Sequence, residues 1–239
     1  MYEVIVLKQG YNISDGPGLM RASGTITLVK GNQNIIVDTG SPWDKQLIID
    51  GLEKFGLKPE EINFVVCTHG HSDHVGNNNL FPNAVHIMSY DVCVGDQYLL
   101  HQFDQGIPYE IDDFVEVLPT PGHTGRDVSV IVRDTAKGTI AIAGDLFECF
   151  EDLEDPTIWQ ENSEKPEEQE ANRIGILQLA DYIIPGHGEM FRVPDSYKKQ
   201  MSVVFFQEIK SHISVDGGVA ESSEYLVYEE SADEGSIDY

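Results

Sequence analysis

A short apolar run leads directly into a histidine cluster in the stretch Phe64-Val65-Val66-Cys67-Thr68-His69-Gly70-His71-Ser72-Asp73-His74. The apolar residues 64–67 predict a buried strand. His69 and His71 are two residues apart, so in an extended segment their side chains point to the same side. Asp73 and His74 follow on a tight turn, which can direct them toward a second ion. Imidazole and carboxylate ligands together suit zinc, and also iron or manganese.

Three further candidate ligands stand where other expected strands end. They are His123 in Pro121-Gly122-His123, Asp145 in Ala143-Gly144-Asp145 and His187 in Pro185-Gly186-His187. Each follows a glycine, as expected for a site built on loops above a rigid sheet. The whole set comprises five histidines and two aspartates, which we divide between two ions. The first ion would be held by His69, His71 and His123, the second by Asp73, His74 and His187, and Asp145 would bridge them.

The remaining chain predicts alternating strands and helices. Apolar and alternating patterns predict strands at residues 4–7, 22–29, 34–38, 84–88, 114–118, 128–132, 139–143 and 182–184. A serine followed by proline at positions 41 and 42 predicts the start of a helix that ends at Gly56. Further helices are expected at 167–179 and 196–211. We expect residues 10–18 to form a turn-rich loop, and expect these side chains to face the core: Leu47, Ile48, Leu52, Phe55, Ile174, Ile176 and Leu177.

The length of 239 residues suits one domain with a sizeable core. Mixed strands and helices with histidines on turns predict an α/β sandwich. We expect this domain to span residues 1–215. Residues 216–239 are acidic and rich in serine, which predicts a disordered tail.

The net charge of −26 is concentrated in two segments: residues 148–170 carry −9 and residues 221–238 carry −7. This balance argues against a broad electrostatic surface for nucleic acid, although a metal-lined groove leaves an RNA substrate open. We expect no DNA partner and no membrane partner, because no apolar run approaches the roughly 18 residues of a membrane span. Three cysteines and an N-terminus without signal-peptide features predict the cytosol or nucleus.

The histidine motif and its surroundings resemble the metallo-β-lactamase superfamily across about residues 3–195. The matching stretches are Val37-Asp38-Thr39-Gly40, residues 68–74, the Pro-Gly-His turn, Ala143-Gly144-Asp145 and Pro185-Gly186-His187-Gly188. This resemblance implies a four-layer αβ/βα sandwich and the seven metal ligands named above. It also implies that Asp38 supports the metal loop. Bacterial β-lactamases of the best-known kind carry cysteine in place of Asp145, so this chain does not look like a true β-lactamase.

A narrower set of matches resembles one subfamily of small metallo-β-lactamase-domain proteins. It includes Gly40-Ser41-Pro42-Trp43, Arg126-Asp127-Val128-Ser129-Val130, Gly144-Asp145-Leu146-Phe147-Glu148 and Phe191-Arg192-Val193. This resemblance implies a glyoxalase II-like core and two zinc ions per chain. It also implies an endoribonuclease that acts at the 3′ end of histone pre-mRNA as a homodimer in cytosol and nucleus. Asp73 and Asp145 would be its catalytic carboxylates, acting with a hydroxide activated by the two metals.

Three functional hypotheses follow. The first is cleavage of single-stranded RNA. The second is a glyoxalase II-like hydrolase of a small thioester or lactone, which the same ligands would serve. The third is a binding protein with a structural metal, which a seven-ligand set with a bridging aspartate disfavours.

Two residues are candidate substrate contacts. Arg126 could clamp a phosphate or carboxylate, or form a surface ion pair with Asp127. His101 could protonate a leaving group, or be a packed or solvent-facing histidine.

Overall fold

The computed structural model describes residues 1–198, and its first sheet has seven strands. In spatial order these are β1 (Glu3–Lys8), β4 (Ile26–Lys30), β5 (Ile35–Val37), β6 (Phe64–Cys67), β7 (Val85–Met88), β8 (Asp91–Val94) and β9 (Gln97–Leu99). Strands β5, β6 and β7 run parallel to one another, and the other neighbours are antiparallel. The carboxyl ends of β5 and β6 therefore lie at the same edge of the sheet.

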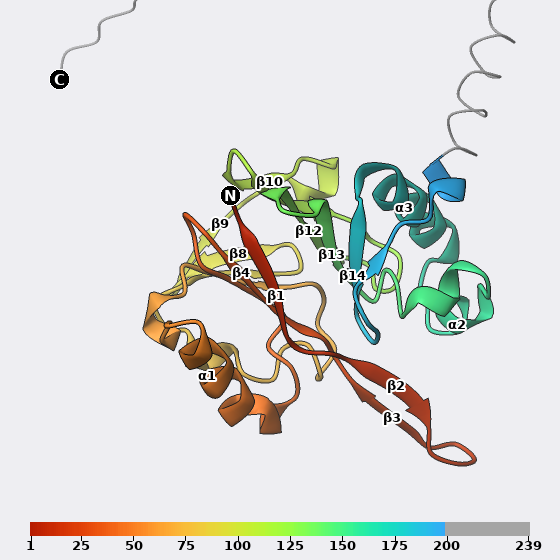
Figure 1. Ribbon diagram of the computed structural model, residues 1–239, viewed down its shortest axis with the longest axis horizontal. Helices are drawn as coiled ribbons and strands as arrows, with labels where there is room; N and C mark the ends of the chain where they lie inside the picture. The colour runs from red at the N-terminus through yellow and green to blue at the C-terminus, as the bar shows by residue number, and fades with distance from the viewer. Residues whose placement is uncertain (199–239) are drawn as a thin grey trace, which may run out of the picture. The chain divides into compact units, whose positions relative to one another are not determined.

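The second sheet has six strands. These are β10 (Tyr109–Asp112), β11 (Val115–Pro119), β12 (Val128–Thr135), β13 (Gly138–Gly144), β14 (Tyr182–Pro185) and β15 (Phe191–Arg192). Only the β13–β14 pair is parallel in this sheet, so these two strands also end at a common edge. A separate hairpin of β2 (Tyr11–Ser14) and β3 (Met20–Ser23) projects beyond both sheets (Figure 1).

Helices cover the outer faces of the two sheets. Helix α1 (Lys45–Lys54) lies against the first sheet, while α2 (Thr157–Gln160) and α3 (Pro166–Leu179) lie on the side of the second (Figure 1). Short 3-10 segments connect other elements: η1 (Pro42–Asp44), η2 (Pro59–Glu61), η3 (Asn78–Leu80), η4 (Phe103–Gln105) and η5 (Phe150–Leu153). The arrangement is the predicted four-layer α/β sandwich. No helix within residues 1–198 combines the length and the apolar character needed to cross a bilayer.

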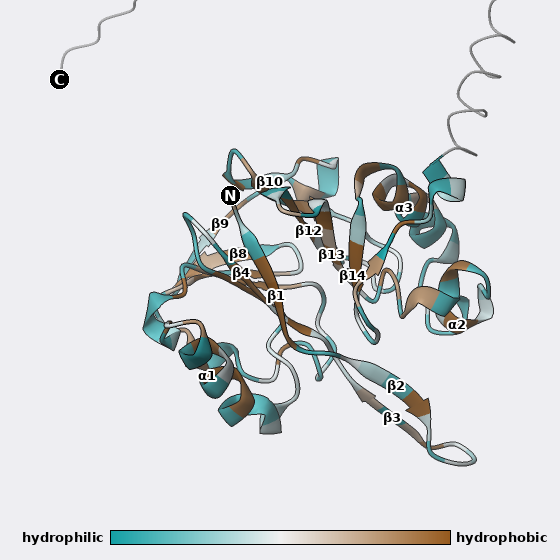
Figure 2. Cartoon of the chain, in the orientation of Figure 1, coloured by the Kyte–Doolittle hydropathy of each residue, from teal (hydrophilic) through white to brown (hydrophobic). Residues whose placement is uncertain are grey.

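Side-chain alternation along the strands separates three hydrophobic cores. In β12, Val128, Val130 and Val132 face the core between the two sheets, whereas Ile131 faces α3. In β5 the middle residue, Ile36, instead packs toward α1. Successive strand residues point to opposite faces, so each central strand must be apolar on both sides. Figure 2 accordingly shows brown, hydrophobic residues along the strands, while α1 mixes teal and brown faces.

Most predicted elements are confirmed, including residues 64–67, which form β6 without a change of boundary. The predicted loop at residues 10–18 is wrong, because residues 11–14 form strand β2. The single strand predicted at 22–29 is two strands, since residues 24 and 25 separate β3 from β4. Leu47 and Ile174 are 38% and 44% exposed, which corrects the prediction that they face the core.

Several predictions reach beyond the described part of the chain. Residues 195–198 are helical, and the rest of the helix predicted at 196–211 lies outside the described residues. The same holds for the domain boundary at residue 215 and for the tail at residues 216–239. Those statements stay predictions.

A buried arginine joins α3 to the loop that follows β13. The guanidinium of Arg173 donates to both carboxylate oxygens of Asp152, at 3.0 and 2.7 Å. It lies over the ring of Phe147, 4.2 Å from its centroid, and over Trp159 at 4.8 Å. The side chains of Arg173 and Asp152 are only 7% and 0% exposed, so each charge is stabilised by the other and not by water.

We expect Arg173→Met to lower the free energy of unfolding by about 3–5 kcal/mol, because it leaves the Asp152 carboxylate buried without its cation. Adding Asp152→Asn should recover part of this loss. Arg192→Met removes an exposed pair with Asp195 and should cost less than about 1 kcal/mol. Urea denaturation measures all of these variants, and equal costs for the two arginine substitutions would contradict the assignment.

Candidate metal centre

Asp38 directly follows β5, and its carboxylate contacts Thr68 at the end of β6 and His74 further along the same loop. The backbone N–H and hydroxyl of Thr68 donate to its two oxygens at 2.7 and 3.0 Å. Nδ1 of His74 lies 2.8 Å from Oδ2 of the same carboxylate. Asp38 adopts a left-handed backbone conformation with φ of +58°, which is rare outside glycine. This carboxylate fixes both ends of the histidine motif, as the predicted supporting role requires.

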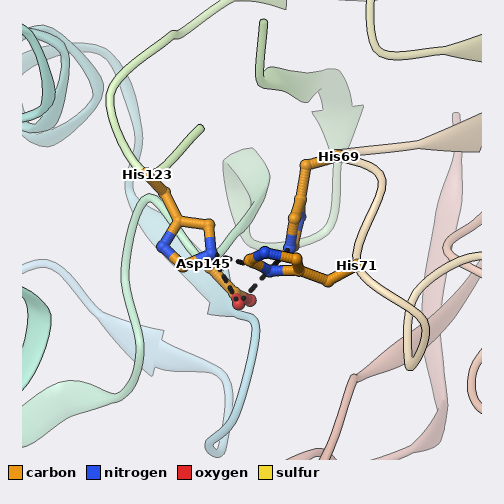
Figure 3. A group of neighbouring side chains, drawn as sticks. All are labelled: His69, His71, His123 and Asp145. Carbon is orange, nitrogen blue, oxygen red and sulfur yellow. Dashed lines mark hydrogen bonds and ion pairs between the residues drawn. The ribbon is translucent and has the colours of Figure 1, made fainter. Parts of the chain in front are cut away.

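Four side chains converge to form the first group, His69, His71, His123 and Asp145 (Figure 3). Nδ1 of His71 lies 2.9 Å from Nε2 of His69 and 3.1 Å from Nε2 of His123. Oδ2 of Asp145 lies 3.5 Å from Nε2 of His69 and 3.3 Å from Nε2 of His123. Ligands bound about 2.1 Å from a tetrahedral ion lie about 3.4 Å apart, which matches this spacing.

The second group contains Asp73, His74 and His187. Oδ2 of Asp73 lies 3.9 Å from Nε2 of His74 and 4.0 Å from Nε2 of His187. Asp145 reaches this group as well, since its Oδ1 lies 3.2 Å from His74 Nε2 and its Oδ2 lies 3.2 Å from His187 Nε2. The structure thus brings all seven predicted side chains together, with Asp145 between the two groups.

Several polar atoms in these two groups are buried and have no hydrogen-bond partner within the described residues. They are Oδ2 of Asp73, Nε2 of His74, Nδ1 of His123 and Oδ1 of Asp145. Leaving a buried polar atom unpaired costs about 1–3 kcal/mol, so such atoms are uncommon without a function. Three of the four face the other candidate ligands, and a cation between them would satisfy them. The residues therefore fit a pair of metal ions.

The electrostatics of the groups centre on Asp145. Burial opposes its charge, but His74 and His187 outweigh burial and hold its pKa well below the usual value. Burial also opposes a charge on His74, yet Asp145 and Asp38 raise its pKa well above the usual value. For His187, Asp145 overcomes burial and raises the pKa to about 9. Asp145 is therefore an ionised carboxylate at the centre of the site, which favours a cation.

Helix α3 holds the loops that carry His123 and Asp145. Nε2 of Gln169 donates to the carbonyl oxygen of Asp145 at 3.0 Å. Nδ2 of Asn172 donates to the carbonyl oxygen of Pro121, two residues before His123, at 2.7 Å. Neither amide could be predicted from the sequence, because a polar residue on a helix carries no signal of a partner that is 24 or 51 residues away in the chain.

Glu148 is a further residue beside the candidate ligands, and the sequence motifs do not assign it a role. It is 3% exposed, and one of its oxygens lies 4.0 Å from Nε2 of His187. Burial and the nearby Asp145 raise its pKa to about 7. Glu148 follows Asp145 by three residues, with two apolar residues between them. This spacing is a sequence signal that could have placed Glu148 near the ligands.

The two candidate substrate contacts differ from the ligands. Arg126 is exposed and lies over the ring of Tyr90, 5.8 Å from its centroid. Asp127 does not lie at the surface, because it is buried and accepts hydrogen bonds from the backbone of Gly122 and Thr124. His101 packs on Phe103 and Tyr109, and its Nε2 lies 3.0 Å from the carbonyl oxygen of Ile107. For His101 the structure favours the packed alternative.

Comparison with known proteins gives the family. Residues 20–92 match the family model of the metallo-β-lactamase superfamily. Metallo-beta-lactamase domain-containing protein 1 of Xenopus laevis is 45% identical over 80% of this chain and 82% of its own length. The human protein of that name is 42% identical with the same coverage. The chain belongs to the metallo-β-lactamase superfamily. This superfamily comprises metal-dependent hydrolases. The two His/Asp groups described above are the candidate metal ligands of this chain.

A solved structure confirms the superfamily fold. The chain aligns with AidC, a dizinc quorum-quenching lactonase solved with the product N-hexanoyl-L-homoserine, at a TM-score of 0.52. The alignment covers 71% of this chain and 74% of AidC, with 19% identity. At that identity the match supports the fold alone.

The buried Asp127 carboxyl makes the stability of the His123 loop depend on pH. Burial raises its pKa from 3.8 to about 6, so the folded state binds this proton more tightly than the unfolded state. Its contribution is then most favourable at low pH and falls as pH rises through the folded pKa. Asp127→Asn keeps an acceptor but cannot ionise.

We expect the variant to gain about 3 kcal/mol relative to the wild type between about pH 4 and pH 7. Denaturation of both proteins in chelator across this range measures the difference. A difference that does not change with pH would show that the Asp127 pKa is not raised.

Proposed function

We propose that this chain is a hydrolase with a two-metal centre that cleaves phosphodiester bonds of single-stranded RNA, with histone pre-mRNA 3′ ends as the candidate substrate. The observation that carries the hydrolase proposal is the convergence of seven candidate ligands around one ionised, partly unpartnered carboxylate, Asp145. The RNA substrate is supported by the subfamily resemblance and by 40–45% identity to relatives of one name. From the same resemblance we propose a homodimer in cytosol and nucleus.

The ligand set would hold zinc, and iron or manganese are compatible alternatives. His69, His71 and His123 would hold one ion, Asp73, His74 and His187 the other, and Asp145 both. Two such ions, when bound, lower the pKa of a water molecule and stabilise negative charge that develops on the scissile group.

The chain's own residues supply orientation. Asp73 would hold the second ion through its buried Oδ2, and its carboxylate would at the same time be placed to orient the attacking water. Asp38 keeps His74 and Thr68 in place through its carboxylate. Gln169 holds the backbone of Asp145 by donating to its carbonyl oxygen. The reacting groups are therefore held by contacts that are already formed before substrate arrives.

One observation favours the alternative, a glyoxalase II-like hydrolase of a small thioester or lactone. One of the cavities that adjoin His187 is lined by Glu148 and Glu161, and apart from His187 itself, a candidate metal ligand, none of its lining residues is basic. An uncharged substrate would enter such a cavity more readily than a phosphodiester would. The alternative therefore belongs in the same experiment as the RNA substrate.

We expect the wild-type chain to bind two zinc ions, measured by elemental analysis after dialysis. Asp38→Ala should weaken zinc binding by about 10–100-fold, because Thr68 and His74 lose their anchor. The matched control is Asp50→Ala, which changes an exposed carboxylate on α1 and should bind zinc as the wild type does. Competition with a chromophoric chelator gives the affinities. Equal zinc binding by both variants would contradict the supporting role of Asp38.

We expect the zinc-loaded protein to cleave a labelled histone pre-mRNA 3′ fragment. Chelator should abolish cleavage, and Asp145→Asn should reduce it by at least about 100-fold, because the bridging carboxylate is lost. A panel of thioesters and lactones is assayed in parallel. Turnover of the panel without RNA cleavage would reject the nuclease and support the alternative.

A further inference from the structure

A cavity of about 460 Å³ adjoins the second ligand group at His187. One wall comes from the β2–β3 hairpin and the other from residues 148–162. The lining includes both apolar and polar side chains. Leu19, Met20 and Ile158 offer apolar surface, whereas Asn12 and Glu148 offer hydrogen-bonding groups. Such a lining suits a flat ring with apolar faces and a polar edge.

Hydrogen bonds of its backbone N–H and carbonyl groups hold Glu148 in the lining of this cavity. Its N–H donates to Oδ2 of Asp152 at 2.7 Å, and its carbonyl oxygen accepts the N–H of His187 at 2.9 Å. Asp152 is in turn held by Arg173. The backbone of Glu148 is therefore fixed, and within residues 1–198 its carboxylate accepts one hydrogen bond, from Nδ2 of Asn12 at 3.4 Å.

The charge of the cavity decides which part of a substrate it can hold. Two acidic side chains, Glu148 and Glu161, line the cavity, and the one basic side chain among its lining residues is His187, which belongs to the second ligand group, so a phosphate is disfavoured in the rest of the cavity. A group with hydrogen-bond donors and no negative charge is favoured, because a buried carboxylate accepts such bonds strongly. Arg126 follows the candidate ligand His123 by three residues, is exposed and does not line this cavity, so it offers an RNA phosphate a cation elsewhere.

We propose that this cavity binds an unpaired nucleobase whose exocyclic amino group donates a hydrogen bond to Glu148. Cytosine and adenine carry such an amino group, whereas uracil presents a carbonyl oxygen at the same edge. Single-stranded RNA is read in this way, with unstacked bases between apolar surfaces and polar side chains at their edges. The inference rests on the proposed RNA substrate and adds a base preference to it.

The test measures binding of cytidine and uridine to the zinc-loaded chain by titration calorimetry or ligand-observed NMR. Nucleosides carry no phosphate and need not be cleaved, so binding is separate from activity. We expect cytidine to bind about tenfold more tightly than uridine. N4,N4-dimethylcytidine, which has no amino hydrogen, should lose this advantage, and this result needs no protein variant.

Two protein variants locate the contact. Glu148→Gln should reduce the preference for cytidine to below about twofold, because an amide both donates and accepts. Glu161→Gln removes the same charge from an exposed position of the same cavity and should keep the preference. Each variant is checked for zinc content equal to that of the wild type.

The outcomes separate the two proposals. Equal binding of cytidine and uridine, or equal effects of the two glutamate variants, would overturn the nucleobase site. RNA cleavage without base preference would overturn it as well and leave the nuclease in place. A cytidine preference that depends on Glu148, without RNA cleavage, would support the site and reject the nuclease.

Discussion

The carboxylate of Asp38 is the constraint on which the rest of the site depends. It ends β5 in a left-handed conformation and binds the first residue after β6, the parallel neighbour of β5. The same carboxylate contacts His74, so the chain between Thr68 and His74 is closed into a loop at both ends. A loop fixed in this way presents its histidines in one geometry, and the two sheets then need only supply the remaining ligands. The second sheet does so by the same topology, because β13 and β14 are parallel and their ends lead directly into Asp145 and, two residues on, His187.

Three separate cores make this convergence rigid. Strand residues that alternate between two apolar faces fix the distance between the sheets, and the outer helices are packed on their own cores. Helix α3 has a second task, because Gln169 and Asn172 bind the backbones of two ligand loops while Arg173 binds the loop of Glu148. Packing and site geometry are therefore coupled through one helix. A substitution on α3 would be felt at the ligands although α3 carries none of them.

The sequence predicts what depends on local pattern, and it misses what depends on distant partners. Strand β6 and the ligand motif are continuous in the chain, and each central strand is apolar on both faces, so these were predicted. Strand β2 was not, because most of its residues are exposed and the glycines and proline beside it resemble a loop. Leu47 and Ile174 carry the periodicity of buried residues yet are exposed, since the layers cover only part of each helix. Asp127 and Glu148 look like surface acids in the sequence, and only the fold shows that both are buried.

The strongly negative charge of the chain bears on how any anion could approach it. Apart from His187, a candidate metal ligand, the cavity lined by Glu148 and Glu161 offers no basic side chain, and Arg126, three residues after His123, is an exposed cation. Asp38, Asp73 and Asp145 add negative charge at the ligand groups themselves. Two divalent ions would outweigh these three carboxylates and turn the centre locally positive on a negative molecule. Attraction of a phosphodiester would then depend on metal loading far more than on surface cations, and few counterions would be released on binding. The negative surface around such a site repels polyanions in general. Substrates would therefore be selected by their fit to the metal centre and to the acidic cavity beside it.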